Sequence, residues 1–170
     1  EALRRLSTTP GFSAQVSAVA TTQEEIAYSG GGARTSAVKL HPDAAIVVDV
    51  THATDYPGVE KKEIRDFKLG CGAVISRGSV VSRVVFDQLV EAAEAEKIPY
   101  AIEAAPRGTN TDADAIHTAR SGVATGLLSV PCRYMHSPNE MVALDDLDRV
   151  ADLLAAWVKR LNTTTSFIPL

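Results

Sequence analysis

A continuous apolar run at residues 44–50 constrains the fold of this chain most, because it reads Ala-Ala-Ile-Val-Val-Asp-Val and Asp49 alone interrupts it. A short apolar run of this kind is typical of a β-strand that is buried on both faces of a sheet. A carboxylate buried in such a strand without a partner is energetically costly. The run therefore predicts a central strand and marks Asp49 as a candidate functional residue.

Strand-like and helix-like stretches alternate along the rest of the chain. Apolar patterns predict strands at 12–22, 73–75, 100–104 and 126–130, helices at 33–40, 82–97, 112–121 and 144–161, and a loop at 51–66. Such alternation predicts an α/β fold with helices on both faces of the sheet. Leu3 and Leu6 follow helical spacing with no capping residue before them, so we expect that the true start lies upstream.

Length and composition narrow the class of protein. The chain has 170 residues, which is enough for one domain. Its composition, with 45% apolar and 22% charged residues, excludes disordered, collagen-like and coiled-coil chains. A net charge of −4 and only 5% aromatic residues argue against a nucleic acid or an anionic membrane as partner. Cys71 and Cys132 form no disulfide framework or CxxC knuckle, and we interpret both as buried thiols. We expect a cytoplasmic globular protein.

Metal-competent side chains lie near the ends of several predicted strands. Glu24 and Glu25 follow the first strand, Asp49 lies in the central one, and His136 follows the last. Ligands collect at the carboxyl ends of strands in α/β sheets, and carboxylates with an imidazole suit zinc, cobalt or manganese. Neighbouring side chains on extended backbone point in opposite directions, so one glutamate would bind metal and the other would act as a general base on a bound water.

Other interpretations of these residues stay open at this point. A Glu-Glu pair also occurs on solvated surfaces, and lone histidines such as His41, His52 and His117 are more often structural or exposed. No Gly-x-Ser-x-Gly elbow or P-loop occurs in the sequence. The segment Gly70-Cys71-Gly72 would suit a cysteine nucleophile, but nothing orders a histidine against it.

Four motifs in order resemble one known family. Residues 20–26 with Gly31-Gly32-Ala33 are similar to the "A-T-x-Q-E-E" motif of the TET-type, glutamyl aminopeptidase-like family of dinuclear metallo-aminopeptidases, some of which carry the label endoglucanase. Residues 48–58 resemble its "D-V-T-x-A-x-D-x-P-G" stretch. Residues 111–113 and 130–138 match "T-D-A" and "P-x-R-Y-x-H-S-P". The resemblance covers nearly the whole chain, including the closing helix.

The resemblance implies a fold and a set of roles. The fold would be a three-layer, mostly parallel or mixed sheet of the zinc-exopeptidase (phosphorylase/hydrolase-like) type, with residues 1–170 as the C-terminal part of one catalytic domain. Glu24 would be the general base, Glu25 and His136 would hold one divalent metal ion, and Asp49 would hold a second; zinc or cobalt would suit these ligands. Residues expected to bind substrate or to support the ligands are Gly70, Gly72, Thr111, Asp112 and Arg133.

The sequence also departs from the family pattern. An upstream histidine in "G-H-x-D", a metal-bridging aspartate in "D-D-R/N-R-x-G" and an inserted β domain all belong to the family and do not occur here. We therefore expect a metal-dependent aminopeptidase of short peptides in the full-length protein, homo-oligomeric from dimer to dodecamer, and weak metal binding without activity in this chain alone. The alternatives are a non-catalytic interaction subunit and an amide deacylase with the same dinuclear chemistry.

Overall fold

A mixed β-sheet forms the centre of the computed structural model, which describes residues 1–26, 30–61 and 66–169. The strands follow the order β1-β4-β2-β3, and a short β5 also pairs with β4. Their bounds are β1 Ala44–His52, β2 Ala73–Gly78, β3 Tyr100–Ala105, β4 Ala124–Arg133 and β5 Met141–Val142. The strands predicted at 44–50, 73–75, 100–104 and 126–130 are therefore confirmed, each somewhat longer than its apolar pattern.

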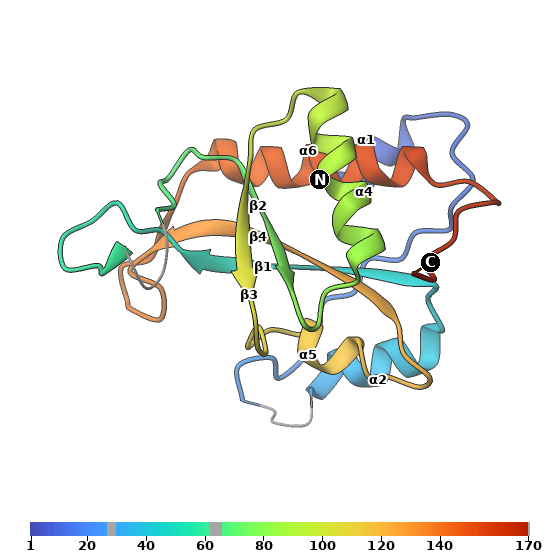
Figure 1. Ribbon diagram of the computed structural model, residues 1–170, viewed down its shortest axis with the longest axis horizontal. Coiled ribbons are helices and arrows are strands. Elements are labelled where there is room, and N and C mark those ends of the chain that lie inside the picture. The colour runs from blue at the N-terminus through green and yellow to red at the C-terminus, as the bar shows by residue number, and fades with distance from the viewer. Residues whose placement is uncertain (27–29, 62–65, 170) are drawn as a thin grey trace.

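The strand directions bring together the segments that follow β1 and β4. β1 runs parallel to β4, with His52 opposite Cys132, and β2 runs parallel to β3. The two pairs join through an antiparallel contact in which Val74 lies opposite Ser129. Because β1 and β4 are parallel, the segments that follow His52 and Arg133 leave the sheet at the same end, as the teal and orange loops show (Figure 1).

Helices cover both faces of this sheet. α1 (Ala2–Ser7), α4 (Arg83–Glu96) and α6 (Leu144–Arg160) pack on one side, and α2 (Gly31–Leu40) and α5 (Ala113–Ile116) pack together on the other (Figure 1). The predicted α/β architecture with helices on both faces is thus confirmed. No helix of the described part of the chain is long and apolar enough to cross a membrane.

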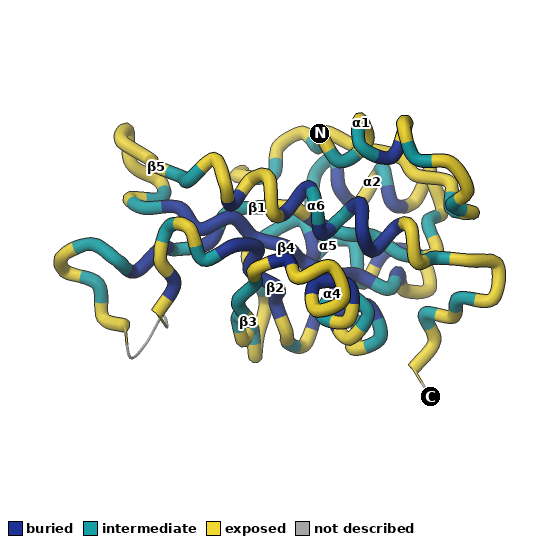
Figure 2. Tube along the Cα trace, turned by 90° about the horizontal axis from the view of Figure 1, so that it is seen from above, coloured by how far each residue is buried: buried dark blue, intermediate teal, exposed yellow. Residues whose placement is uncertain are grey.

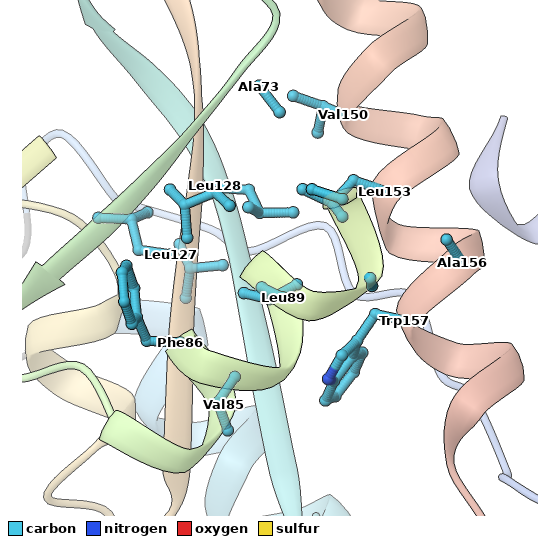
Figure 3. Close-up of a cluster of buried hydrophobic side chains, with 14 of the residues drawn as sticks. Ala73, Val85, Phe86, Leu89, Leu127, Leu128, Val150, Leu153, Ala156 and Trp157 are labelled. Atoms are coloured by element: carbon cyan, nitrogen blue, oxygen red, sulfur yellow. The ribbon is translucent and has the colours of Figure 1, made fainter. Parts of the chain in front are cut away.

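The main core lies between the sheet and the pair α4 and α6. Leu89 of α4, Leu128 of β4 and Leu153 of α6 are each completely buried and pack in one cluster (Figure 3). Figure 2 shows the same pattern along the chain, with buried stretches in β4 and α6 and exposed loops around them. Gly126 of β4 allows this packing, since a Cβ there would lie 2.7 Å from Val85 Cγ1 of α4.

Local signals explain where the helices begin and end. Ser82 caps α4 by accepting a hydrogen bond from Val85 N, and Lys97 closes the helix in a left-handed conformation with its N–H on Ala93 O. α6 carries Asp145 in its first turn and basic residues in its last, which matches the helix dipole.

The strand expected at 12–22 is wrong: the structure assigns these residues neither strand nor helix. Their alternating pattern suits extended backbone, but a strand also needs a neighbour for its ladder, and no described strand pairs with them. Val16 and Val19 are consequently 36% and 46% exposed.

Two further expectations need correction. β1 is not buried on both faces, because it lies at the edge of the described sheet and Val48 is 48% exposed. The helix expected at 112–121 is limited to Ala113–Ile116, and turns follow it up to Gly122. The short strand β5 was not expected from the sequence; its two residues carry too little pattern to detect.

Candidate active site

Glu24 and Glu25 lie in a tight turn. The turn is closed by a hydrogen bond from Ile26 N to Gln23 O (3.3 Å), and Gln23 has a left-handed backbone with φ 63°. Gly32 N of α2 donates to Thr22 O (2.9 Å), so the turn is docked on the first residues of that helix. The expectation that the two glutamates follow a strand on extended backbone is therefore wrong, although both still project from one short segment.

His136 lies in a second strained turn, directly after β4. Tyr134 and His136 have φ of 59° and 64°, values that residues other than glycine rarely adopt. Ser137 N donates to Tyr134 O, and His136 N donates to Glu140 Oε1 (2.6 Å). The His136 imidazole lies 3.6 Å from the Glu25 carboxylate, measured from Nε2 to Oε2. Two distant motifs of the sequence therefore meet.

Asp49 joins the same group of charges from β1. It is half-buried and accepts a hydrogen bond from Val50 N at 2.7 Å. Burial raises the pKa of its carboxyl above the ordinary value, and the negative charges of Asp112 and Glu25 add to the rise, while Val50 N and His136 oppose it.

Glu24 responds to the same neighbours. Burial raises the pKa of its carboxyl, and the charges of Asp49, Glu25 and Asp112 raise it further, whereas His136 lowers it. These mutual effects mean that four carboxylates and one imidazole lie within electrostatic reach of one another. The structure thus brings together Glu24, Glu25, Asp49, Asp112 and His136, which come from separate parts of the chain.

Asp112 and Thr111 belong to the loop that leads into α5. Thr21 Oγ1 donates to Asp112 Oδ2 at 2.6 Å, which ties this loop to the segment before Glu24. Thr111 Oγ1 accepts from Ala113 N (3.2 Å) and lies 2.9 Å from Thr109 Oγ1. Thr111 and Asp112 line the same cavity as Glu24, and their expected supporting role stays a prediction.

An open cavity of about 710 Å³ lies between the glutamate turn, α2 and α5. Glu24, Glu25 and Asp112 line one part of it, and Arg34 of α2 supplies a positive charge. A cavity of this size accommodates a small peptide or a ligand of similar dimensions. Glu24 therefore lines an open hollow of the surface.

Gly70, Gly72 and Arg133 have other partners. The amides of Gly70 and Gly72 each donate to the buried carboxylate of Asp146 in α6, at 2.8 Å. The Arg133 guanidinium binds Asp55 through two hydrogen bonds of 2.8 and 2.6 Å. Within the described residues, no hydrogen bond or ion pair links these three residues to the carboxylates around Glu24.

Comparison with known proteins decides the family. The family model of the M42 glutamyl aminopeptidases matches residues 1–153. The chain belongs to this family. The M42 chain is 36% identical over 149 residues to a lysyl aminopeptidase of Pyrococcus furiosus. This match covers 88% of this chain and 42% of that protein. It therefore spans about two fifths of the length of this curated relative.

Solved structures agree with the M42 assignment. The structure is similar to aminopeptidase APDkam598 from the archaeon Desulfurococcus kamchatkensis, with a TM-score of 0.83 and 38% identity over 94% of this chain and 45% of that one. The Pyrococcus horikoshii TET1 peptidase, which can assemble into a tetrahedron or a large octahedral shell, matches with a TM-score of 0.60 and 28% identity. That match covers 83% of this chain and 40% of the other.

The donor atoms in the M42 chain suit a divalent metal ion, but their number is small. Glu25 and His136 form a close carboxylate–imidazole pair, and Asp49 offers a further carboxylate nearby. Across residues 1–26, 30–61 and 66–169, no three His, Cys, Asp or Glu side chains converge closely enough to hold an ion. The set has the chemistry of part of a metal site.

Three carboxylates with supporting contacts were not singled out as site residues from the sequence. Asp55 binds Arg133, Asp146 binds the two glycine amides, and Glu103 accepts hydrogen bonds from Thr51 Oγ1 (2.7 Å) and Ser76 Oγ (3.2 Å). Their partners lie 27 to 78 positions away in the chain. No local sequence signal marks such pairs, although Asp55 lies inside one of the motifs that carry the family resemblance.

Proposed function

We propose that the complete protein is a metal-dependent aminopeptidase that removes the N-terminal residue from short peptides, and that this chain supplies its general base and part of its metal ligands. The observation that carries the proposal is the contact of His136 with Glu25, next to Glu24 in a turn that lines an open cavity. Asp49 lies near enough for its charge to raise the pKa of Glu24. M42 membership and the aminopeptidase names of its relatives support it.

Each residue has a role in the proposed reaction. Glu25 and His136 would hold one divalent ion and Asp49 a second, and bound ions of this kind polarise a carbonyl and lower the pKa of water. The Glu24 carboxylate accepts the proton of the attacking water and afterwards delivers it to the leaving amine. We further propose that the remaining ligands come from residues outside this chain, since the described ones offer too few.

Two coarser proposals concern the complete protein, one from a relative and one from the cysteines. The TET1 peptidase forms large closed assemblies, and we propose that the complete protein is likewise a homo-oligomer. We propose a cytoplasmic location, in line with the unpaired cysteines at 71 and 132. Light scattering on the complete protein would measure its assembly.

Replacing the base tests the proposed reaction. In the complete protein, Glu24→Gln keeps the shape of the side chain but cannot accept a proton, so we expect hydrolysis of short peptides to fall by roughly 100-fold or more while the metal content is unchanged. Turnover and metal content by mass spectrometry are measured together. Glu91→Gln, on the exposed side of α4, is the matched control.

Retention of full activity in Glu24→Gln would exclude Glu24 as the base. A parallel panel of short peptides and N-acyl amino acids separates an aminopeptidase from a deacylase with the same chemistry. Cleavage of the acyl compounds with the peptides left intact would exclude the aminopeptidase.

A further inference from the structure

We propose that Asp55 is a positioning residue for His136: it fixes the base of the exposed turn that presents the imidazole to Glu25. This inference rests on the proposed function only where it assigns His136 a role. The turn needs such support because core packing does not hold it. The His136 side chain is 67% exposed, and both Tyr134 and His136 adopt unfavourable left-handed backbone conformations.

The contact between Asp55 and Arg133 lies at the start of this turn. The carboxylate accepts two parallel hydrogen bonds from the guanidinium, at 2.8 and 2.6 Å, and the two side chains are only 16% and 28% exposed. A fork of this kind fixes orientation as well as distance. Since Arg133 is the last residue of β4, the pair determines the direction in which the chain leaves the sheet.

The next residue of each segment adds a second contact between them. The ring of Tyr56 lies against the ring of Tyr134, with centroids 4.7 Å apart and planes tilted by 52°. Residue 55 therefore contacts residue 133, and residue 56 contacts residue 134. Beyond this point the turn closes on itself, through Ser137 N on Tyr134 O and His136 N on Glu140 Oε1.

Asp55 can act as a fixed support because its own segment is anchored. Ala53 and Thr54, which precede it, are completely buried, and their amides donate to Cys132 O and Phe67 O. Leu69 N donates to Asp55 Oδ2 at 3.2 Å. The loop that contains Leu69 is in turn fastened to α6 through Asp146. The path thus runs from α6 to the turn of His136.

The histidine signals of the 170-residue chain test this role without metal or turnover. Imidazole Cε1–Hε1 correlations are recorded about two pH units above the ordinary histidine pKa, so that protonation does not contribute. His136→Gln identifies the signal of interest among the four histidines. We expect Asp55→Asn to move the His136 signal by more than its linewidth and Arg133→Lys, which keeps the charge but loses the fork, to move it less.

Glu96→Gln is the matched control, because it removes an ion pair with Arg160 between α4 and α6 and should leave His136 in place. In the complete protein, Asp55→Asn should lower kcat by roughly 10- to 100-fold with KM little changed, since a displaced ligand affects the reaction more than binding.

An unmoved His136 signal in folded Asp55→Asn and Arg133→Lys overturns the inference, and Arg133→Lys decides alone if Asp55→Asn does not fold. Equal movement in the Glu96→Gln control also overturns it. The failure of the proposed function has a different signature, namely full hydrolysis by Glu24→Gln, and the two results are independent.

Discussion

Asp55 shows how one contact changes the properties of a single residue. Its two hydrogen bonds with Arg133 lower the pKa of the carboxyl to about 2, and the bond from Leu69 N adds to this effect against an opposing contribution from burial. In the unfolded chain the pKa would be close to 3.9. The folded state therefore favours the charged form, and this preference stabilises the fold.

The sign of this shift gives a pH-dependent prediction. A carboxyl with a lower pKa in the folded state contributes its stability above the unfolded pKa and loses it as the pH falls through the folded pKa. We expect Asp55→Asn to lower the free energy of unfolding by about 2 kcal/mol at neutral pH. The difference from wild type should shrink as the pH falls from about 4 to 2.

Urea unfolding followed by the fluorescence of Trp157, the single tryptophan, measures this difference at each pH. Glu1 also has a lowered pKa, but it is present in both proteins and its effect cancels. A difference that stays constant down to pH 2 would contradict the assignment.

Two glycines of one loop permit a second test at this scale. Gly70 and Gly72 have similar left-handed φ values of 85° and 92°, and each amide binds Asp146. A Cβ at Gly72 would lie 2.0 Å from Pro99 O, whereas a Cβ at Gly70 meets nothing within 4 Å. We expect Gly72→Ala to cost about 2 kcal/mol or more and Gly70→Ala about 1 kcal/mol.

Thermal or urea unfolding of the two variants measures the comparison. The two glycines have similar backbone conformations and both bind Asp146. The additional loss of stability in Gly72→Ala therefore reports the contact with Pro99. Equal losses in the two variants would show that this close approach has little energetic effect.

The chemistry that makes Glu24, Glu25, Asp49 and His136 candidates is visible locally in the sequence, and their roles stay a prediction. In the structure, Glu25 contacts His136, and the charges of Asp49 and Glu25 raise the pKa of Glu24. The sequence could not identify Asp55 as a support, because its importance depends on a guanidinium 78 positions away. Pairing across such distances is a property of the fold and has no local pattern.

At the scale of elements, helices and strands with a strong apolar pattern were predictable. α4 and α6 agree with their expected ranges within about a residue because a capping residue or acidic first turn accompanies a helical apolar face. The strand expected at 12–22 failed because its pattern describes one strand and not the partner that it needs. The helix expected at 112–121 was too long, since turns end α5 after Ile116.

The contact between α4 and the sheet provides the prediction at this scale. Leu89 is completely buried among the residues of the main core, so its truncation leaves a cavity that the neighbours fill only in part (Figure 3). We expect Leu89→Ala to lower the free energy of unfolding by about 2 to 5 kcal/mol. Glu91→Ala, two positions along the same helix and exposed, should change it by less than about 0.5 kcal/mol.

Denaturant unfolding of both variants at neutral pH measures the two changes. A loss below 1 kcal/mol for Leu89→Ala would mean that α4 contributes little to the cooperative core. Such a result would contradict the central position of this helix between β4 and α6.

The molecule as a whole combines a closed core with a candidate site that, in our proposal, needs further ligands. The core between the sheet, α4 and α6 is closed, whereas the edge of β1 and residues 12–22 leave apolar side chains such as Val48 and Val19 exposed. The candidate site lies on this less complete side, where Glu24 follows residues 12–22 and Asp49 lies in β1. Among the described residues, no three His, Cys, Asp or Glu side chains lie close enough together to hold a metal ion.

The proposed need for further ligands leads to the last prediction, which concerns metal binding by the 170-residue chain. A closed zinc site uses four protein ligands, and the chain offers Glu25 and His136 as a pair with Asp49 nearby. We expect the isolated chain to hold less than one zinc or cobalt ion after dialysis and to bind added zinc weakly, with a Kd above about 1 µM.

Calorimetric titration with zinc, together with metal analysis of the dialysed protein, tests this expectation. His136→Gln should remove the weak binding, and His41→Gln, which alters an exposed histidine at the end of α2, should leave it unchanged. Tight binding of two ions by the chain alone would show that its own residues complete the site. In that case the proposed ligands from outside the chain would be unnecessary, and the chain itself should hydrolyse peptides.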